Sequence, residues 1–161
     1  MSLYASKSAR WPPQSLDVFM WNHPAVISTP SYFEKREMVR KTWANYLQSY
    51  SSHLTVVGFA FVVGLTESNS TQQIIEEESR TNRDIIQINM DDSYRNLTMK
   101  VTALLNWIHL NCAKVDFVLK VDDDVYANAH NLFHLTQNYY HESNITLFAG
   151  EFNEYPPHRG T

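Results

Sequence analysis

Three adjacent carboxylates, Asp122, Asp123 and Asp124, directly follow an apolar run at residues 117–121. The run is short and almost continuously apolar, which is typical of a buried strand in an α/β sheet. Such sheets bind ligands beyond the carboxyl ends of their strands. Carboxylates crowded there repel one another unless a cation or hydrogen-bond donors neutralise them. Hard oxygens suit Mg²⁺ or Mn²⁺, which take further ligands from phosphates and water, so the pattern indicates a metal-diphosphate site.

The same triplet also fits a simpler interpretation. It could form a solvated acidic loop that caps the next helix through Asx hydrogen bonds. A lone acidic triplet is a weak motif, and its spacing leaves both interpretations open.

Two further groups of charged residues have the spacing of helix faces. Arg36 and Arg40 are four residues apart, which places them on one face of a predicted helix. Spacing alone favours solvent exposure for both arginines. The acidic run Glu76, Glu77 and Glu78 is predicted to be a solvated helix face.

The composition is that of a folded domain. The 161 residues can bury one core, and 43% hydrophobic residues with only four glycines argue against disorder. A net charge of -4 argues against general nucleic-acid binding, which usually needs a basic face. Cys112 is the only cysteine, so no internal disulfide is possible, and we expect a buried, inert thiol. No stretch approaches the ~20 apolar residues of a membrane span and the first residues lack a signal pattern, so we expect a soluble chain.

The elements that must position the aspartates alternate between β and α. Strands are predicted at 16–21 (interrupted at 22–24 and resumed at 25–27), 54–63, 84–88, 117–121 and 145–149, and helices at 32–50, 72–81, 94–111 and 127–140. The alternation predicts an α/β domain with a mainly parallel sheet and helices on both faces. We expect residues 1–15 to be a polar lead-in, 16–161 to be the domain, and strand 117–121 to be internal in the sheet.

The predicted boundaries rest on individual residues. Ser31 and Glu34 form a capping-box pattern for the helix at 32–50, and Gly64 is expected to end the strand that precedes it. The buried stripe of the first helix is predicted to contain Val39, Trp43, Tyr46, Leu47 and Tyr50, and that of helix 94–111 Leu97, Val101, Leu104 and Ile108, widened by Leu105 and Trp107.

Four separated blocks carry a resemblance to a known family. They are Arg36–Trp43, the pair Asp84–Ile86 and Asp91–Lys100, Trp107 with Cys112, and Phe117–Asn128. Each block alone is weak, but their order and spacing together are specific. The chain resembles the β-1,3-galactosyltransferase-type glycosyltransferases of family 31, and this resemblance favours the metal-diphosphate interpretation.

The resemblance implies a GT-A (Rossmann-like) nucleotide-sugar domain in which the aspartates are the DxD motif. By this likeness Asp124 would bind Mn²⁺ (or Mg²⁺) directly, Asp122 would face the ribose and uracil side and share the metal site, and Asp123 would support the turn. Candidate nucleotide-sugar contacts are Asp122, Asp123, Arg36, Arg40, Asp91 and Asp92. For the arginines and for Asp91 and Asp92, structural ion pairs and helix capping remain an equal alternative.

The family's chemistry implies a UDP-sugar donor, a glycan or glycoprotein acceptor, transfer of galactose or N-acetylhexosamine in β-1,3 linkage with inversion, and a lumenal Golgi location. Its members are usually longer and membrane-anchored, so we expect the acceptor base beyond residue 161 and an anchor outside this chain. Sequons at Asn69 and Asn144 are plausible glycan acceptors, whereas Asn96 lies inside a family block and is expected to be structural. A non-catalytic relative that binds UDP-sugar, and an unrelated α/β Ca²⁺-binding module, remain alternative functions.

Overall fold

The structure is a computed structural model that describes residues 22–49, 59–112, 117–132 and 134. Its strands are β1 (Asn22–Ile27), β2 (Ala60–Leu65), β3 (Ile85–Asp91) and β4 (Phe117–Asp122). Its helices are α1 (Phe33–Val39), the π-helical η1 (Arg40–Ala44), α2 (Asn45–Ser49), α3 (Asn69–Asn82), the 3-10 turn η2 (Tyr94–Asn96) and α4 (Leu97–Asn111). Residues 129–132 and 134 are also helical.

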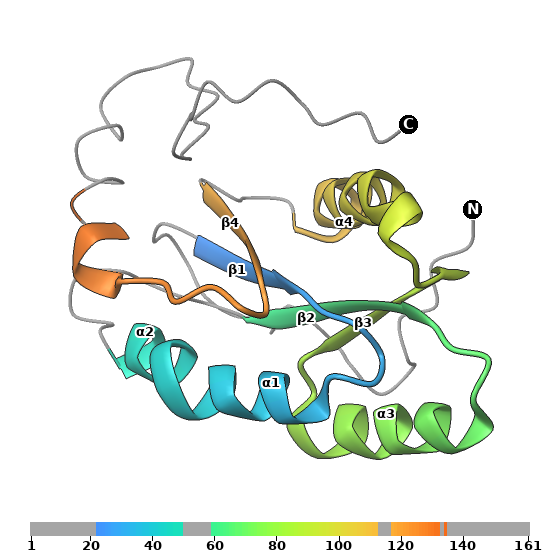
Figure 1. Ribbon diagram of the computed structural model, residues 1–161. Helices are drawn as coiled ribbons and strands as arrows, with labels where there is room; N and C mark the ends of the chain where they lie inside the picture. Colours follow the sequence, from blue (N-terminus) through green and yellow to red (C-terminus); the bar gives the residue numbers. More distant parts are fainter. Residues whose placement is uncertain (1–21, 50–58, 113–116, 133, 135–161) are drawn as a thin grey trace, which may run out of the picture.

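The four strands form one parallel sheet in the order β3-β2-β1-β4. Helix α4 covers one face, and α1, α2 and α3 cover the other (Figure 1). The predicted α/β class, with a parallel sheet and helices on both faces, is therefore confirmed. Because all strands run the same way, their carboxyl ends meet at one edge of the sheet, where ligands of such folds bind.

Each face of the sheet packs its own apolar cluster. Strand residues such as Ile27, Val62 and Ile88 pack with Leu104, Trp107 and Ile108 of α4. Alternate strand residues, among them Val26, Phe61 and Val63, pack with residues that include Val39, Trp43 and Leu47. Burial on both faces explains why the strands are apolar almost throughout. Cys112 belongs to the first cluster, and burial raises the pKa of its thiol, as predicted for an inert cysteine.

Several predicted strand boundaries were wrong. Residues 22–24 form the first half of β1 instead of interrupting it. Pro24 is in register with Leu119 of β4, but the backbone groups of the even-numbered residues of β1 face β2, as the bond from the Ser28 N–H to the Val62 carbonyl shows. Described pairing with β2 begins only at Ala25, so no described ladder bond needs the N–H that Pro24 lacks. Strand β2 continues past Gly64 to Leu65, and β3 continues three residues beyond the predicted end at Ile88. The predicted segments 16–21 and 145–149 lie outside the described residues.

Strand β4 was expected to be internal, but among the described residues it pairs only with β1 and lies at the edge of the sheet. Its position agrees with its partial exposure, because Val118 and Leu119 are half-buried and Lys120 is exposed. The expectation that its aspartates follow the carboxyl end of a parallel strand is confirmed.

The first helix is interrupted where one continuous helix was predicted. The dihedral angles of Thr42 are non-helical (φ -109°, ψ -111°), and its hydroxyl donates to the carbonyl of Met38 at 2.7 Å. Such bonding to the carbonyl four residues earlier competes with the backbone ladder and bends helices. The change of direction leaves Tyr46 50% exposed, although its spacing predicted burial.

Other helix predictions were partly correct. The N-cap of α1 is Tyr32, with no side-chain cap hydrogen bond, so the predicted Ser31 capping box is absent. Helix α3 begins at Asn69, three residues earlier than expected, because the Ser68 hydroxyl accepts a hydrogen bond from the Thr71 N–H. The stripe of α4 is confirmed except for Leu105, which is 54% exposed.

Candidate functional site

The turn after β4 holds the three carboxylates at the carboxyl edge of the sheet. Asp122 is in register with Ile27, the last residue of β1. The Asp123 N–H donates to the Ile27 carbonyl at 3.1 Å, and the Val125 N–H donates to the Asp122 carbonyl at 3.2 Å. These bonds tie the turn, hereafter the aspartate turn (residues 122–124), to the end of β1.

The middle carboxylate is used by the protein itself. Asp123 accepts a hydrogen bond from the Ser28 hydroxyl at 2.8 Å and an ion pair from Lys35 at 3.1 Å, and its side chain is only 8% exposed. The hydrogen bond to Asp123 raises the pKa of the Lys35 ammonium. These bonds connect Asp123 to the end of β1 and to α1.

The two flanking carboxylates remain accessible. Asp122 is 47% exposed and pairs with the half-exposed Lys120 at 2.8 Å. Asp124 is exposed, and within the part of the chain that the structure describes it has no hydrogen bond or ion pair, although the Lys35 ammonium bound to Asp123 also attracts it electrostatically. Crowded carboxylates that lack full neutralisation fit a hard divalent cation, so the donor chemistry of these residues is suitable for Mn²⁺ or Mg²⁺.

A cleft of about 420 Å³ opens at the carboxyl ends of the first three strands. Its walls come from the loop after β1 (residues 29–31), the loop after β2 (residues 65–68) and the end of β3 (Asp91 and Asp92). The loop after β1 also follows Ser28, which contacts the aspartate turn. The cleft and the turn therefore flank the same short segment of backbone.

Asp91 and Asp92 both lie at the cleft, but their environments differ. Asp91 is exposed, and its main-chain carbonyl accepts a hydrogen bond from the Asn96 amide at 3.0 Å. The Asp92 carboxylate is 10% exposed and accepts hydrogen bonds from Lys100 at 2.7 Å and from the Gly64 N–H at 2.8 Å. Asp92 is thus held by protein donors, whereas Asp91 can face a ligand.

Gly64 allows the ends of β2 and β3 to approach this closely. A Cβ atom there would lie 2.8 Å from the Met90 carbonyl oxygen and 2.9 Å from the Asp92 Cβ. The register between the strands also shifts between Val63 and Leu65. Only glycine fits this position without displacing Met90 or Asp92, and Asp92 lines the cleft.

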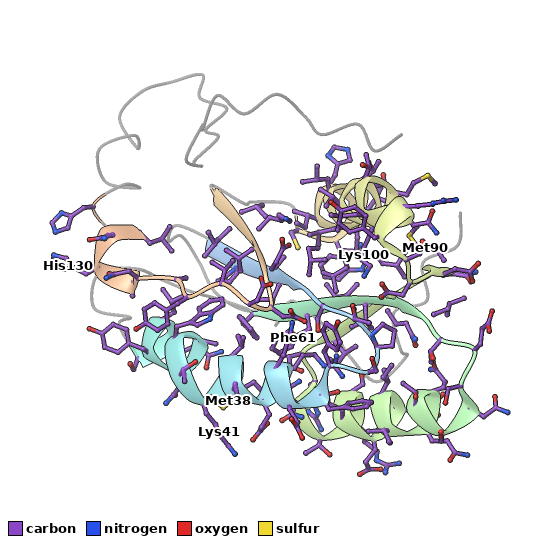
Figure 2. The ribbon with its side chains drawn as sticks, in the orientation of Figure 1. Met38, Lys41, Phe61, Met90, Lys100 and His130 are labelled. Carbon is purple, nitrogen blue, oxygen red and sulfur yellow. The ribbon has the colours of Figure 1, made fainter. Side chains whose placement is uncertain are left out.

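Lys100 joins two of these groups and was not predicted as a site residue. It projects from α4 toward the sheet (Figure 2), is 3% exposed, and donates to the Ser28 carbonyl at 3.0 Å as well as to Asp92. The signal was present in the sequence. Lys100 lies three residues after Leu97 and four before Leu104, within the apolar stripe, where a lysine is rarely buried without a partner.

The structure favours the structural alternative for Arg36. It is fully buried, and all five of its N–H groups have acceptors: Glu78, the Ser28 hydroxyl, and the carbonyls of Thr29 and Pro30. No donor is left for a diphosphate. The expectation of solvent exposure, drawn from its spacing, was wrong.

Arg40 lies at the opposite end of the sheet from the cleft. It forms a bidentate pair with Asp84, which precedes β3, at 2.7 and 2.8 Å, and it reaches Glu78 at 2.7 Å. Its guanidinium also stacks over Phe61, near the beginning of β2, at 4.7 Å from the ring centroid. Arg40 was a candidate nucleotide-sugar contact, but it lies away from the cleft, and the structure favours the ion-pair alternative for it.

Glu78 was predicted to be solvated but is 9% exposed and pairs with both arginines. Burial raises the pKa of its carboxyl, but the hydrogen bonds and charges of Arg36 and Arg40 outweigh burial, so the pKa lies below its ordinary value. Glu76 and Glu77 are exposed, as predicted.

Within residues 22–49, 59–112, 117–132 and 134, no group of three or more His, Cys, Asp or Glu side chains could by itself hold a metal ion. The described residues likewise contain no helix that is long and apolar enough to cross a membrane.

The galactosyltransferase family model matches residues 34–160 of the chain. Human N-acetyllactosaminide beta-1,3-N-acetylglucosaminyltransferase 3 is 34% identical over 128 residues, which cover 77% of this chain and 33% of the relative. Lactosylceramide 1,3-N-acetyl-beta-D-glucosaminyltransferase A of Danio rerio is 32% identical over 138 residues, which cover 82% of this chain and 36% of the relative. Human beta-1,3-galactosyltransferase 9 is 36% identical over 107 residues, which cover 66% of this chain and 28% of the relative.

The chain spans about a third of the length of the curated relatives that it matches. The matched region contains all the blocks that carry the sequence resemblance, from Arg36 to Asn128. The parallel α/β sheet and the aspartates at its carboxyl edge agree with that match. The chain belongs to the galactosyltransferase family.

Proposed function

We propose that this chain is the donor-binding part of a UDP-sugar-dependent hexosyltransferase that transfers galactose or N-acetylhexosamine to a glycan in β-1,3 linkage with inversion. Its relatives include proteins named as galactosyltransferases and as N-acetylglucosaminyltransferases. Both sugars therefore stay within the proposal.

The observation that carries the proposal is the unequal environment of the three aspartates. The protein neutralises Asp123 directly with Ser28 and Lys35, but it gives the exposed Asp124 of the same turn no described hydrogen bond or ion pair and only the electrostatic attraction of Lys35. Leaving one carboxylate unpaired next to two others is unfavourable in the free protein. A site that binds a cation together with a polyanion would explain this arrangement.

We propose that Asp124, with Asp122, holds Mn²⁺ or Mg²⁺ when UDP-sugar binds. Such a cation neutralises the negative charge that develops on the departing diphosphate. The described side chains provide few ligands of their own, which fits a cation that takes most of its ligands from phosphates and water. A self-contained Ca²⁺ site needs six to eight oxygen ligands, so the Ca²⁺-module alternative is less well supported.

We propose the cleft between residues 29–31, 65–68 and 91–92 as the nucleoside site. It shares the loop after β1 with the aspartate turn, so one nucleotide could contact both regions. Asp91 and Asp122 are proposed as direct contacts because both are accessible. Asp92 and Asp123 are proposed to act by holding the backbone around the ligand, since protein donors already occupy their carboxylates.

A glycan or glycoprotein acceptor and a lumenal Golgi location belong to the same proposal. Of the three sequons, Asn69 is exposed at the start of α3, whereas the Asn96 amide is engaged by the Asp91 carbonyl. Asn69 is therefore the better candidate of the two for N-glycosylation of this chain, and Asn144 lies outside the described residues. A relative that binds UDP-sugar without transferring it is the second candidate, and a sugar-transfer assay separates it from the first.

The test is calorimetry with UDP and Mn²⁺ on the wild-type chain, Asp124→Ala and a matched acidic control, Glu76→Ala. Glu76 is an exposed carboxylate on α3 outside the cleft lining. We expect Asp124→Ala to weaken Mn²⁺-dependent UDP binding by about a hundredfold or more, the upper range for losing even an outer-shell partner of a metal. Glu76→Ala should bind like wild type. Equal binding by all three proteins would refute the metal assignment.

A further inference from the structure

Ser28, the first residue after β1, contacts four different parts of the fold and is 3% exposed. Its N–H donates to the Val62 carbonyl of β2 at 3.0 Å, and its carbonyl accepts from Lys100 of α4 at 3.0 Å. Its hydroxyl donates to Asp123 at 2.8 Å and accepts from Arg36 of α1 at 3.3 Å. This residue was not among the predicted site residues.

The direction of the two hydroxyl bonds is determined by their partners. A guanidinium can only donate, and an ionised carboxylate can only accept. The single Ser28 hydroxyl proton is therefore committed to the Asp123 carboxylate, while a lone pair receives the Arg36 N–H. Arg36 is in turn fixed by Glu78 at 2.6 Å, so the buried ion pairs hold the hydroxyl in the orientation that Asp123 requires.

Ser28 also connects the aspartate turn to the cleft. Lys100 joins the Ser28 carbonyl to the Asp92 carboxylate, and Asp92 accepts from the Gly64 N–H of β2. Asp92 lines the cleft, and Ser28 directly precedes the cleft residues 29–31. A displacement of Ser28 would therefore affect both the turn and the cleft wall.

We propose that Ser28 is a positioning residue that holds Asp123 and thereby presents Asp122 and Asp124 to the cation and diphosphate of a donor bound in the cleft. The identity of the ligand in this proposal rests on the proposed function. The other part, that the Ser28 hydroxyl restrains the aspartate turn, concerns the protein alone and needs no ligand. Ser28 itself is buried and has its proton engaged, so it acts through Asp123 and not on the substrate.

The first experiment needs no ligand. Hydrogen exchange is measured at the amides of Asp123 and Val125, which close the aspartate turn, and at those of Phe61 and Cys112, which lie elsewhere. In Ser28→Ala we expect exchange at Asp123 and Val125 to accelerate about tenfold, the scale of losing a hydrogen bond to a charged group. Phe61 and Cys112 should keep their protection. Ser79→Ala, which removes a hydroxyl from another buried serine (6% exposed), is the matched control and should change none of the four amides.

The second experiment measures affinity for UDP with Mn²⁺ and for uridine alone. In Ser28→Ala we expect UDP with Mn²⁺ to bind about tenfold more weakly, and uridine binding to change much less, because the cleft wall keeps its backbone bonds. Ser28→Thr retains the hydroxyl and should restore both the exchange protection and the UDP affinity. A general structural defect would instead weaken uridine and UDP equally and would overturn the proposal.

Failure of the two ideas can be told apart. If the wild-type chain binds no UDP, the proposed function fails and the hydrogen-exchange result still decides the role of Ser28. Unchanged exchange at Asp123 and Val125 in Ser28→Ala would overturn the inference even if UDP binds. If Ser28→Ala does not fold, Asp123→Asn, at the other end of the same hydrogen bond, replaces it and should accelerate exchange at Val125.

Discussion

Two clusters of charged side chains both contact the Ser28 hydroxyl, one through Arg36 and the other through Asp123, and they differ in where their neutralising partners come from. The buried ion-pair cluster consists of Arg36, Arg40, Glu78 and Asp84. The aspartate turn consists of residues 122–124. Both clusters consist of ordinary charged residues, yet the protein neutralises them to different extents.

In the ion-pair cluster the chain supplies every partner. Two arginines meet two carboxylates, and Arg36 fills its remaining donors with main-chain carbonyls and the Ser28 hydroxyl. Charges removed from water in this way are retained only when they are paired and hydrogen-bonded. The cluster therefore joins α1, α3 and the beginning of β3, and it leaves no charge available to a ligand.

In the aspartate turn the chain supplies partners for part of the charge. Lys35 and Ser28 bind Asp123, and Lys120 pairs with Asp122 at the surface. Asp124 has no described hydrogen bond or ion pair and is attracted only electrostatically by Lys35. The comparison teaches that neither residue type nor spacing separates structural from functional charges. The useful distinction is whether the folded chain completes the neutralisation, and the following predictions test it.

The largest effect is expected on the stability of the buried cluster. Arg36→Met removes one of the two arginines that pair with Glu78 and leaves this carboxylate with Arg40 alone. Breaking a buried ion pair typically costs about 3–5 kcal/mol, and we expect a loss of about 3 kcal/mol because Arg40 still neutralises part of the charge. Lys41→Met is the control, since Lys41 points away from the sheet (Figure 2) and its pair with Glu37 is exposed. Urea unfolding should show a large drop in midpoint for Arg36→Met and almost none for Lys41→Met. Similar midpoints would mean that the cluster is not structural.

A smaller loss of stability is expected beneath the cleft, where the constraint is steric instead of electrostatic. Gly64→Ala would place a methyl group 2.8 Å from the Met90 carbonyl oxygen. Overpacking of this kind costs about 1–3 kcal/mol. Thermal unfolding measures the loss, and uridine affinity should fall as well because Asp92 must move. Wild-type stability and affinity would show that β2 and β3 can separate without affecting the cleft.

The free energy of unfolding should depend on pH at acidic values because Glu78, a member of the ion-pair cluster, is protonated there. Its pKa in the folded protein lies below the ordinary value of 4.5, so its pairing stabilises the fold above that range. The contribution is lost as pH falls through the lowered pKa, because the unfolded chain then binds the proton more readily. Glu78→Gln should flatten the acid limb of a plot of unfolding free energy against pH. An acid limb as steep as that of wild type would assign the effect to other carboxylates.

The pattern of the sequence was sufficient to predict the class of fold and the location of the aspartates. Alternating apolar runs determine the strand and helix order, and an apolar strand followed by carboxylates can only end at the carboxyl edge of a parallel sheet. The boundaries at Gly64 and Pro24 were wrong because turn-forming residues were given more weight than the pairing with neighbouring strands, which a single segment does not reveal.

The roles of individual charged residues were harder to predict. Arg36 and Glu78 are 42 residues apart, and neither has a local feature that indicates burial. Their pairing depends on α1 and α3 packing on the same face of the sheet, which is a tertiary effect. Lys100 is the exception, because its place within an apolar stripe is visible in the sequence. The unequal roles of three identical neighbours, Asp122 to Asp124, also require the structure, since only the path of β1 decides which of them meets Ser28.

The smallest effect is expected in the aspartate turn, where neutralising Asp124 should hardly change the stability of the ligand-free protein. Asp124→Asn removes a charge that has no described hydrogen bond or ion pair and that lies beside two like charges. The free energy of unfolding should therefore stay within about 0.5 kcal/mol of wild type, as for surface substitutions away from structural features, or rise slightly. Asp123→Asn should lose more, because the ion pair with Lys35 and the bond from Ser28 both weaken. Urea unfolding of both variants without metal or nucleotide gives the measurement. If Asp124→Asn proved as destabilising as Asp123→Asn, the protein itself would be neutralising Asp124, and that carboxylate would belong with the ion pairs of α1 and α3 and not with a ligand site.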